Sequence, residues 1–239
     1  PPSPRTEAPM TWLITGASRG LGRHLALALA RRGQGVIAAA RDRARLDALA
    51  AEAPPGMIKP LRLDLADGAT LAASVADAIA PLARLSGVIN NAGIGVYKPF
   101  LEHSERESLE ILQVNLAAIV QICHAVLPKL LAQGHGHIVN IGSDLARRPL
   151  ANMSVYAASK HGLAGFSHSL LREVKGAGIK VSLVNPGIID TDFGGAAEGS
   201  RDPAASLRPA QLASLIVQLI EHGAMLVDEL TVHPPGQDF

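Results

Sequence analysis

A serine, a tyrosine and a lysine in the second half of this 239-residue chain have spacings that suit proton transfer. Tyr156 and Lys160 are four residues apart, so a helix would place both side chains on one face. An ammonium about 4 Å from a phenol favours the phenolate by roughly 4 kcal/mol at an effective dielectric constant of ~20, or about three pK units. Ser143 follows a strand-like run and could hydrogen-bond a substrate oxygen. The three residues therefore predict proton transfer to or from a carbonyl or an alcohol.

Glycines follow the first strand-like run of the chain. Gly16, Gly20 and Gly22 have the spacing Gly-x-x-x-Gly-x-Gly and stand where a helix-like run begins. Glycines there permit a tight turn and a close approach of the backbone to a pyrophosphate, and the helix N-terminus adds free N–H groups and a positive dipole end. The segment indicates a dinucleotide-binding turn, although glycines alone also fit an ordinary strand-to-helix turn.

The second strand-like run indicates which dinucleotide is preferred. An NAD site carries an acidic residue about 20 residues after the glycine turn, where it binds the ribose 2′-hydroxyl. Here the run ends in alanines followed by Arg41, and no carboxylate stands at its tip. Arg41 and Arg19 could bind a 2′-phosphate through their guanidinium groups. We therefore expect NADP(H) rather than NAD(H); two solvated arginines are the alternative, and Asp42 partly offsets Arg41.

Short apolar runs alternate with longer amphipathic runs along the whole chain. This alternation predicts right-handed βαβ units and an α/β fold, a single Rossmann-type doubly wound parallel sheet with helices on both faces. The predicted strands are Trp12–Thr15, Val36–Ala40, Ile58–Asp64, Val88–Asn90, His137–Gly142, Lys180–Asn185 and Leu230–His233; the predicted helices are Leu21–Arg31, Arg43–Glu52, Ala69–Ala83, Glu105–Leu131, Val155–Lys175 and Pro209–His222.

The sequence predicts one domain after a short tail. Residues 1–9 contain four prolines and no apolar stretch, so we expect a flexible tail and not a signal peptide. Residues 10–239 form the predicted dinucleotide-binding domain, with substrate loops at about 144–155 and 187–206. The second loop follows the carboxyl end of a strand, which is the edge where open α/β sheets bind ligands.

Composition argues against several classes of partner. The net charge is +1 and aromatic residues make up 3%, so neither nucleic acid nor an anionic membrane is expected. No run approaches the ~18 apolar residues of a membrane span. The single cysteine, Cys123, rules out an internal disulfide and favours a cytoplasmic location. The close pair His135 and His137 lacks a third ligand nearby, so no metal site is expected.

Four motifs occur in one order along the chain: the glycine turn, Asn90-Asn91-Ala92-Gly93, Tyr156-x-x-x-Lys160 and Asn185-Pro186-Gly187. Together they resemble the short-chain dehydrogenase/reductase family, from about Met10 to the C-terminus. The resemblance implies that Tyr156 is the general acid/base and that Lys160 binds the nicotinamide ribose and lowers the tyrosine pKa. It further implies that Ser143 holds the substrate oxygen and that Asn115 anchors a water linking Lys160 to solvent.

The resemblance also implies which residues contact the cofactor. Besides Arg41 they would lie at the glycine turn, after the third and fourth strands, at the catalytic helix and after the sixth strand. They are Gly16, Ser18, Arg19, Gly20, Leu21, Asp64, Leu65, Asn91, Ala92, Gly93, Tyr156, Lys160, Pro186, Gly187, Ile188 and Thr191.

Other features bear on the substrate and on assembly. The ending Val232–Phe239 lacks the Asp-Gly-Gly of many family members, so the role of the ketoacyl reductases of fatty-acid synthesis is not assigned. Arg147, Arg148 and Asp144 could touch the substrate or be solvated, and Tyr97 and Phe100 could wall the pocket. Apolar residues on two faces of the helices 105–131 and 155–175 favour a homodimer, with a homotetramer as the alternative.

The predicted activity is NADP(H)-dependent interconversion of a small-molecule carbonyl and alcohol. An NAD(H)-dependent alcohol dehydrogenase of the same family is one alternative. A non-catalytic dinucleotide sensor is another, although a pure binder has no need of the Asn-Ser-Tyr-Lys set. A lyase- or epimerase-like relative is a third.

Overall fold

The computed structural model describes residues 10–237, and the predicted tail at residues 1–9 lies outside them. At its centre is a seven-stranded sheet in the order β3-β2-β1-β4-β5-β6-β7, with every neighbouring pair parallel. The strands are β1 Thr11–Thr15, β2 Gly35–Ala40, β3 Ile58–Arg62, β4 Leu85–Asn90, β5 Gly136–Ile141, β6 Ile179–Pro186 and β7 Glu229–Val232. Because β1 and β4 are neighbours, the chain reverses its direction of winding between them, and the carboxyl ends of these strands flank the expected ligand crevice.

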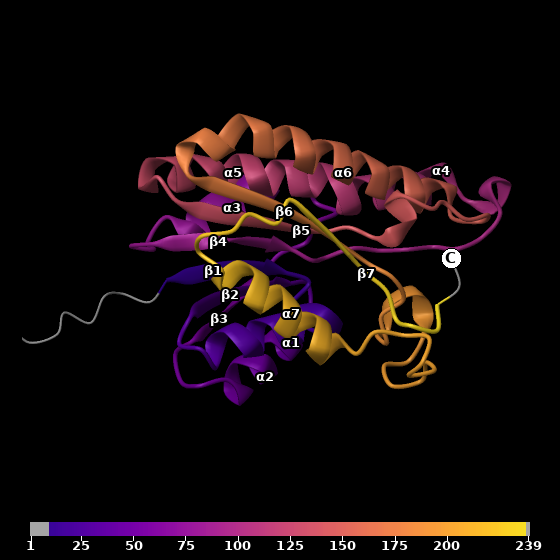
Figure 1. The fold of residues 1–239 in the computed structure, drawn as a ribbon, viewed down its shortest axis with the longest axis horizontal. Helices are drawn as coiled ribbons and strands as arrows, with labels where there is room; N and C mark the ends of the chain where they lie inside the picture. The colour runs from indigo at the N-terminus through magenta and orange to yellow at the C-terminus, as the bar shows by residue number, and fades with distance from the viewer. Residues whose placement is uncertain (1–9, 238–239) are drawn as a thin grey trace, which may run out of the picture.

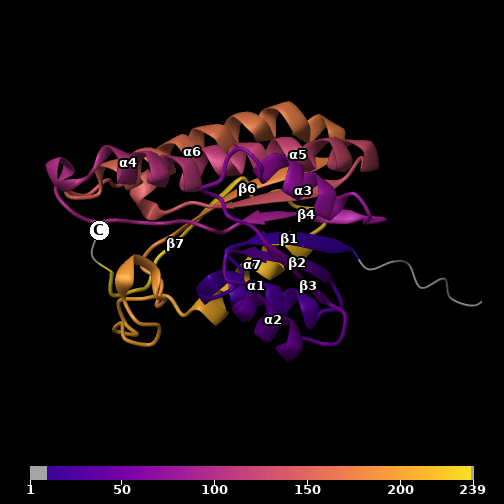
Figure 2. The same ribbon diagram turned by 180° about the vertical axis from the view of Figure 1, so that it is seen from behind.

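Helices cover both faces of the sheet, as the sequence predicted (Figure 1). They are α1 Gly20–Ala30, α2 Arg43–Glu52, α3 Leu71–Ile79, α4 Glu105–Leu112, α5 Ala118–Gln133, α6 Ser154–Val174 and α7 Pro209–Glu221. Helices α1, α2 and α7 lie on one face, and α3 to α6 form the layer on the other, which Figure 2 shows from behind. The predicted doubly wound α/β fold is therefore confirmed.

Two apolar cores follow from this arrangement, one on each side of the sheet. Neighbouring strand residues point to opposite faces, so Leu13 joins the core under α3, α5 and α6 while Ile14 joins the core under α1, α2 and α7. Both side chains are fully buried. Burial on both faces explains why the strands are near-continuous apolar runs with little alternation.

Several predicted boundaries shift. Strand β4 begins at Leu85 and not at Val88, and helix α3 ends at Ile79 and not at Ala83. Strand β3 ends at Arg62 and not at Asp64. Helix α3 begins at Leu71 and not at Ala69, because the Asp67 carboxylate accepts hydrogen bonds from the Ala69 N–H and the Thr70 hydroxyl and so closes a turn first.

The predicted helix Glu105–Leu131 is not a regular α-helix. A π-helical segment, Gln113–Ala117, separates α4 from α5, and α5 continues to Gln133 before Gly134 ends it with a φ of 68°. A π-segment inserts extra backbone into a helix and is frequent at functional sites. Here it contains Asn115, whose side chain is buried.

The sequence led us to expect no run as long and apolar as a membrane span, but the stretch Glu105–Gln133 meets that criterion. Among the described residues it is the one helical stretch long and apolar enough to cross a bilayer, with a mean hydropathy of 1.7 over its most apolar window. Its residues Ile119, Ile122 and Val126 are fully buried in the core beneath the helix. That packing identifies the stretch as a core helix of this domain.

A buried histidine makes the fold sensitive to acid. His137 on β5 is 6% exposed, and its Nε2 lies 2.8 Å from the Ser182 hydroxyl, which itself donates to the Val227 carbonyl. Burial, with a smaller effect of Lys180, lowers the pKa of His137 from 6.5 to about 4. The unfolded chain therefore binds a proton more readily, so the stability this group contributes is complete above pH 6.5 and is lost as the pH falls toward 4.

We expect this histidine to account for a loss of about 3 kcal/mol in the free energy of unfolding between pH 7 and pH 4. Urea titrations across that range measure it. A His137→Gln variant should lose markedly less stability on acidification than the wild type, whereas His135→Gln, at a half-buried position two residues away, should match the wild type. Equal acid losses in all three proteins would contradict the assignment.

Candidate active site

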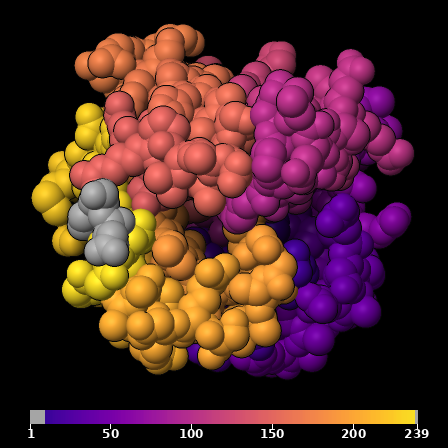
Figure 3. All heavy atoms as spheres, turned by 90° about the vertical axis from the view of Figure 1, so that its right-hand side faces the viewer, coloured from indigo at the N-terminus to yellow at the C-terminus, as the bar shows by residue number. Residues whose placement is uncertain are grey.

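A cleft of about 1020 Å³ opens at the carboxyl edge of the sheet. In Figure 3, where this edge faces the viewer, a hollow lies between the helical layer above and the loop after β6, drawn in orange, below. Every residue expected to contact the cofactor lines the cleft, and so does Ser143. Asn115 does not line it and lies behind the wall.

The glycine turn forms one end of the cleft. Gly16 and Gly20 have φ values of 66° and 51°, which side chains disfavour. A Cβ at Gly22 would collide with the Gly16 carbonyl and with the Asn91 amide, which donates to the carbonyls of Thr15 and Gly16. Within residues 10–237 no side chain caps the N-terminus of α1, and the first helical residues, Gly20 and Leu21, line the cleft. A backbone cradle of this kind fits a pyrophosphate.

The tip of β2 lies beside this cradle. Arg41 is exposed at the rim, and no ion pair of its guanidinium is found within residues 10–237. Asp42 is occupied as the N-cap of α2, since it accepts from the Arg45 N–H and pairs with the Arg45 guanidinium at 3.3 Å. Arg19 instead pairs with Asp192 across the cleft at 2.6 Å. Of the two predicted phosphate ligands, Arg41 is therefore the one free of a carboxylate partner.

Tyr156 and Lys160 lie in the first turns of α6 and are 6% and 4% exposed. The Lys160 ammonium donates to the Ile141 carbonyl at 2.8 Å and lies 5.7 Å from the centroid of the tyrosine ring. Burial lowers the pKa of Lys160 from 10.5 to about 8.

The expected lowering of the tyrosine pKa by Lys160 is wrong for this structure. Burial raises the pKa of Tyr156, and Tyr97 and Asp144 add to the rise, while a hydrogen bond involving Ser143 opposes it. The ammonium is directed at a backbone carbonyl rather than at the phenol oxygen, so desolvation outweighs its charge.

Ser143 begins the loop after β5 and is 7% exposed. Its hydroxyl donates to Asp144 at 3.1 Å and accepts from the Leu145 N–H at 3.2 Å. Its own N–H donates to the Asn185 side chain at 3.2 Å. The backbone position of Ser143 is therefore set by a residue on the neighbouring strand β6.

Asn115 holds the wall of the cleft from behind. Its amide accepts from the Ile94 N–H at 2.9 Å, donates to the Ile94 carbonyl at 2.8 Å and donates to the Ser159 hydroxyl at 3.2 Å. A Cβ at Gly93 would lie 3.3 Å from the Asn115 oxygen and 3.9 Å from the Lys160 nitrogen. The backbone of Gly93 therefore lies between the side chains of Asn115 and Lys160.

The remaining wall near Tyr156 is aromatic and polar. Tyr97 packs edge-on against Tyr156 with centroids 5.8 Å apart, and Phe193 packs on it at 5.9 Å. Tyr97 lines the cleft as expected, but Phe100 does not and is exposed. Phe193 was missed because it lies in a loop without periodicity. Gln237 was missed too: its side chain accepts from the Ile188 N–H at 2.9 Å and donates to Asp144 at 2.6 Å.

The suggestion that Arg147 touches the substrate is wrong. Its guanidinium binds the Glu229 carboxylate on β7 with two hydrogen bonds, of 3.1 and 2.5 Å, and neither it nor Arg148 lines the cleft. Asp144, in contrast, does line the cleft, and its side chain is 14% exposed. Within residues 10–237 no cluster of three His, Cys, Asp or Glu side chains is arranged to hold a metal ion.

The fold and the cleft are typical of a dinucleotide-binding α/β domain, and comparisons with known proteins identify its family. The family described as short chain dehydrogenase matches residues 10–201. The 3-oxoacyl-[acyl-carrier-protein] reductase FabG of Escherichia coli strain K12 is 34% identical over 236 residues, covering 94% of this chain and 95% of that protein. The chain belongs to the short-chain dehydrogenase/reductase family.

Solved structures with bound cofactors have the same fold. An alcohol dehydrogenase from the archaeon Thermococcus sibiricus, complexed with 5-hydroxy-NADP, superposes with a TM-score of 0.90 at 27% identity and covers 96% of this chain and 98% of its own. A short-chain dehydrogenase from Sphingobium yanoikuyae in complex with NADPH gives 0.83 at 31% identity, covering 96% and 89%. The chain is thus an oxidoreductase of this family.

Proposed function

We propose that this protein is an NADP(H)-dependent oxidoreductase that interconverts a small-molecule carbonyl and an alcohol. The observation that carries the proposal is one continuous cleft with a phosphate cradle and Arg41 at one end and Ser143, Tyr156 and Lys160 at the other. The bound nicotinamide would supply or accept the hydride, and the protein would supply orientation and proton transfer.

The catalytic side chains divide this work between them. The Ser143 hydroxyl would hold the substrate oxygen, exchanging its bond to Asp144 for one to the substrate. The Tyr156 phenol would give its proton to that oxygen in reduction and take it back in oxidation. Burial raises the pKa of the phenol, so it carries its proton at neutral pH, and proton transfer in reduction requires a nearby cation to stabilise the phenolate that forms.

Lys160 and Asn115 would support the proton transfer. The ammonium stabilises negative charge that develops on the phenol oxygen, and it would bind the nicotinamide ribose from its buried position. Asn115 hydrogen-bonds the backbone of Ile94. It thereby fixes the position of Gly93, which lies between Asn115 and Lys160. The assignment of Ser143, Tyr156 and Lys160 rests on their convergence at one end of the cleft, and that of Asn115 on its hydrogen bonds to the Ile94 backbone behind the wall.

The preference for NADP(H) is tested at Arg41. Arg41→Asp should weaken NADPH binding by about ten- to hundredfold, because the substitution removes a charge-assisted bond to the 2′-phosphate and adds a repelling charge. NADH affinity should stay the same or rise. Isothermal titration calorimetry with both cofactors measures the change.

A matched control is Arg43→Asp, which alters an exposed arginine that is paired with Asp47 on α2 and does not line the cleft. That variant should keep the cofactor preference of the wild type. Tighter NADH than NADPH binding by the wild type would favour the NAD(H)-dependent alcohol dehydrogenase instead. Absence of binding by either cofactor would contradict the proposal as a whole.

Two classes of carbonyl compound are candidate substrates. The likeness to FabG makes 3-oxoacyl thioesters one class worth assaying. The segment that differs from the ketoacyl reductases, however, places Gly236 and Gln237 in the cleft wall, next to Asp144. We therefore propose aldehydes and ketones without a carrier as the preferred class. A non-catalytic sensor would bind cofactor but turn over none of these.

Assembly and location complete the proposal. Leu109, Val120 and Leu131 are 57%, 39% and 43% exposed along the helical stretch from α4 to α5. An apolar outer face on a helix already buried on its inner side favours pairing of two copies there. We propose a homodimer in the cytoplasm, with a homotetramer as the alternative.

A further inference from the structure

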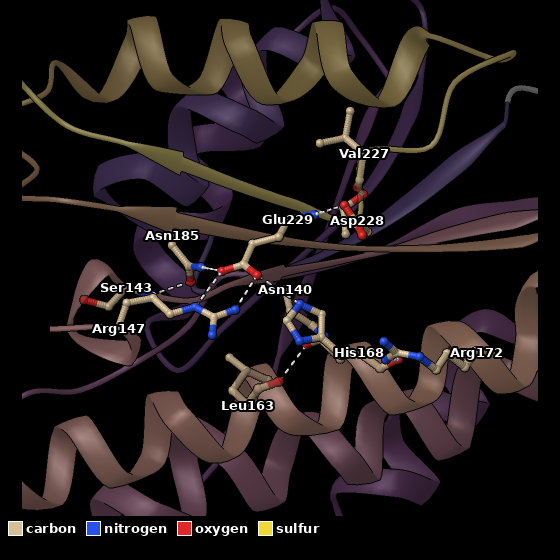
Figure 4. A network of polar contacts seen from close by, with 12 residues as sticks. Asn140, Ser143, Arg147, Leu163, His168, Arg172, Asn185, Val227, Asp228 and Glu229 are labelled. Carbon is tan, nitrogen blue, oxygen red and sulfur yellow. Dashed lines mark hydrogen bonds and ion pairs between the residues drawn. The ribbon is translucent and has the colours of Figure 1, made fainter. Parts of the chain in front are cut away.

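Glu229 lies on β7, the last strand of the sheet, and does not line the cleft. Its side chain is 22% exposed, and three residues from different elements converge on its carboxylate (Figure 4). Arg147 binds it with two hydrogen bonds, His168 lies 3.1 Å away, and the Asn185 amide donates to it at 2.7 Å. Arg147, as the largest influence, holds the pKa of this carboxyl below its usual range, so the carboxylate is charged.

The contact with Asn185 determines which way that amide faces. Asn185 is fully buried on β6, and its nitrogen must point to Glu229 because the carboxylate only accepts hydrogen bonds. The amide oxygen is thereby turned toward the loop after β5, where it accepts from the Ser143 N–H at 3.2 Å. Figure 4 shows this chain of contacts from Glu229 through Asn185 to Ser143.

The backbone beside this contact is shaped to accommodate it. A Cβ at Gly142 would collide with the Asn185 oxygen, so a residue with a side chain could not stand next to Ser143 without displacing the amide. The Gly142 N–H donates to the Val184 carbonyl at 2.7 Å, which fixes the preceding residue. The absence of a side chain at Gly142 thus leaves room for the Asn185 oxygen to accept from the Ser143 N–H.

The geometry points to Glu229 as a positioning residue that sets the place of Ser143 through Asn185; this inference rests on the proposed function. Glu229 would act without touching the reactants, because it does not line the cleft. Without its carboxylate the buried amide loses its only acceptor among the contacts described for its nitrogen, and it is free to rotate away from Ser143. Misplacement of a reactive group by about 1 Å costs as much as a hundredfold in rate.

The ion pair of Glu229 with Arg147 provides a control. The Arg147 side chain is 53% exposed, and exposed pairs contribute little to stability. Arg147→Ala removes this pair and leaves the contact between Glu229 and Asn185 in place. Glu229→Gln does the converse: a carboxamide oxygen still accepts from Asn185, but the charge that Arg147 and His168 face is gone.

The kinetic test compares the three variants with the wild type in the reduction of a carbonyl compound by NADPH. Glu229→Ala should lower kcat by about ten- to hundredfold with cofactor affinity within about twofold. Glu229→Gln and Arg147→Ala should stay within about threefold of wild-type kcat. Equal losses in Glu229→Ala and Arg147→Ala, or a loss that falls on cofactor affinity alone, would overturn the inference.

A second readout does not depend on turnover. Hydrogen exchange followed by NMR should show the Ser143 amide exchanging about three- to tenfold faster in Glu229→Ala than in the wild type, with the Glu229→Gln variant near wild type. Unchanged exchange at Ser143 in Glu229→Ala would contradict the positioning role even if the enzyme is active. A protein without carbonyl turnover whose Ser143 amide responds in this way would contradict only the proposed function.

Discussion

Replacement of Tyr156 by Phe is expected to lower kcat by about 10²- to 10⁴-fold, the range that a general acid or base contributes. The ring is 6% exposed and packed by Tyr97 and Phe193, so removal of the hydroxyl leaves the packing of the wall intact. Cofactor affinity should therefore change by less than about twofold. Steady-state kinetics and calorimetric titration with NADPH measure the two quantities on the same protein.

Two outcomes would contradict the role of this tyrosine. Turnover within about tenfold of wild type would mean that another group transfers the proton. Loss of cofactor binding together with turnover would mean that the hydroxyl acts in binding or folding. A dinucleotide sensor would show no turnover before or after the substitution and unchanged cofactor binding, so the same pair of assays separates an enzyme from a binder.

Replacement of Lys160 by Met is expected to abolish most activity and to stabilise the protein. Turnover should fall by about a hundredfold or more, because the variant loses the one positive charge proposed to bind the nicotinamide ribose and to stabilise the phenolate. The free energy of unfolding at pH 7 should rise by about 2 kcal/mol. Burial lowers the Lys160 pKa from 10.5 to about 8, a cost near 3 kcal/mol, and the lost hydrogen bond to Ile141 offsets about 1 kcal/mol of the gain.

The pH dependence gives this prediction a distinct signature. Between pH 8 and pH 10.5 the unfolded chain binds the lysine proton more tightly than the folded protein does, so wild-type stability rises with pH from this group. The methionine variant lacks this rise, so the difference in free energy of unfolding between the variant and the wild type should shrink from pH 8 to pH 10.5. Urea titrations at several pH values measure it. A variant less stable than wild type at pH 7 would show that the ammonium contributes to stability and does not reduce it.

The alternation of apolar runs was sufficient to predict the fold. Parallel strands buried on both faces are near-continuous apolar segments, and the helices between them are amphipathic, so the order of elements could be read from the chain. The site could be predicted where its residues are close in sequence or follow strand ends. The glycine turn after β1 and the pair Tyr156 and Lys160 on α6 are of this kind.

Contacts between distant segments could not be predicted in the same way. Helix spacing puts Tyr156 and Lys160 on one face, but it does not say that the ammonium points at the Ile141 carbonyl or how deeply the phenol is buried. The direction of the tyrosine pKa was therefore wrong. The π-segment around Asn115 interrupts a run whose composition looks uniformly helical, so only the packed structure reveals it.

The network behind Ser143 shows the same limitation. Glu229 is 86 positions away from Ser143 in the sequence, and the two are connected only because β5, β6 and β7 are neighbours in the sheet. Gln237 reaches Ile188 and Asp144 for a comparable reason. Neither residue belongs to a motif, and their contacts with the site arise only from the way the chain folds.

Transfer of a labelled hydride tests the central claim most directly. The protein would be incubated with NADPH deuterated at C4 of the nicotinamide and a set of aldehydes, ketones and 3-oxoacyl thioesters, and the products would be analysed by mass spectrometry. We expect an alcohol that carries the deuterium on the former carbonyl carbon, in an amount that the Tyr156→Phe variant lowers by about 10²-fold or more. A protein that binds NADPH but transfers deuterium to none of these compounds would contradict it.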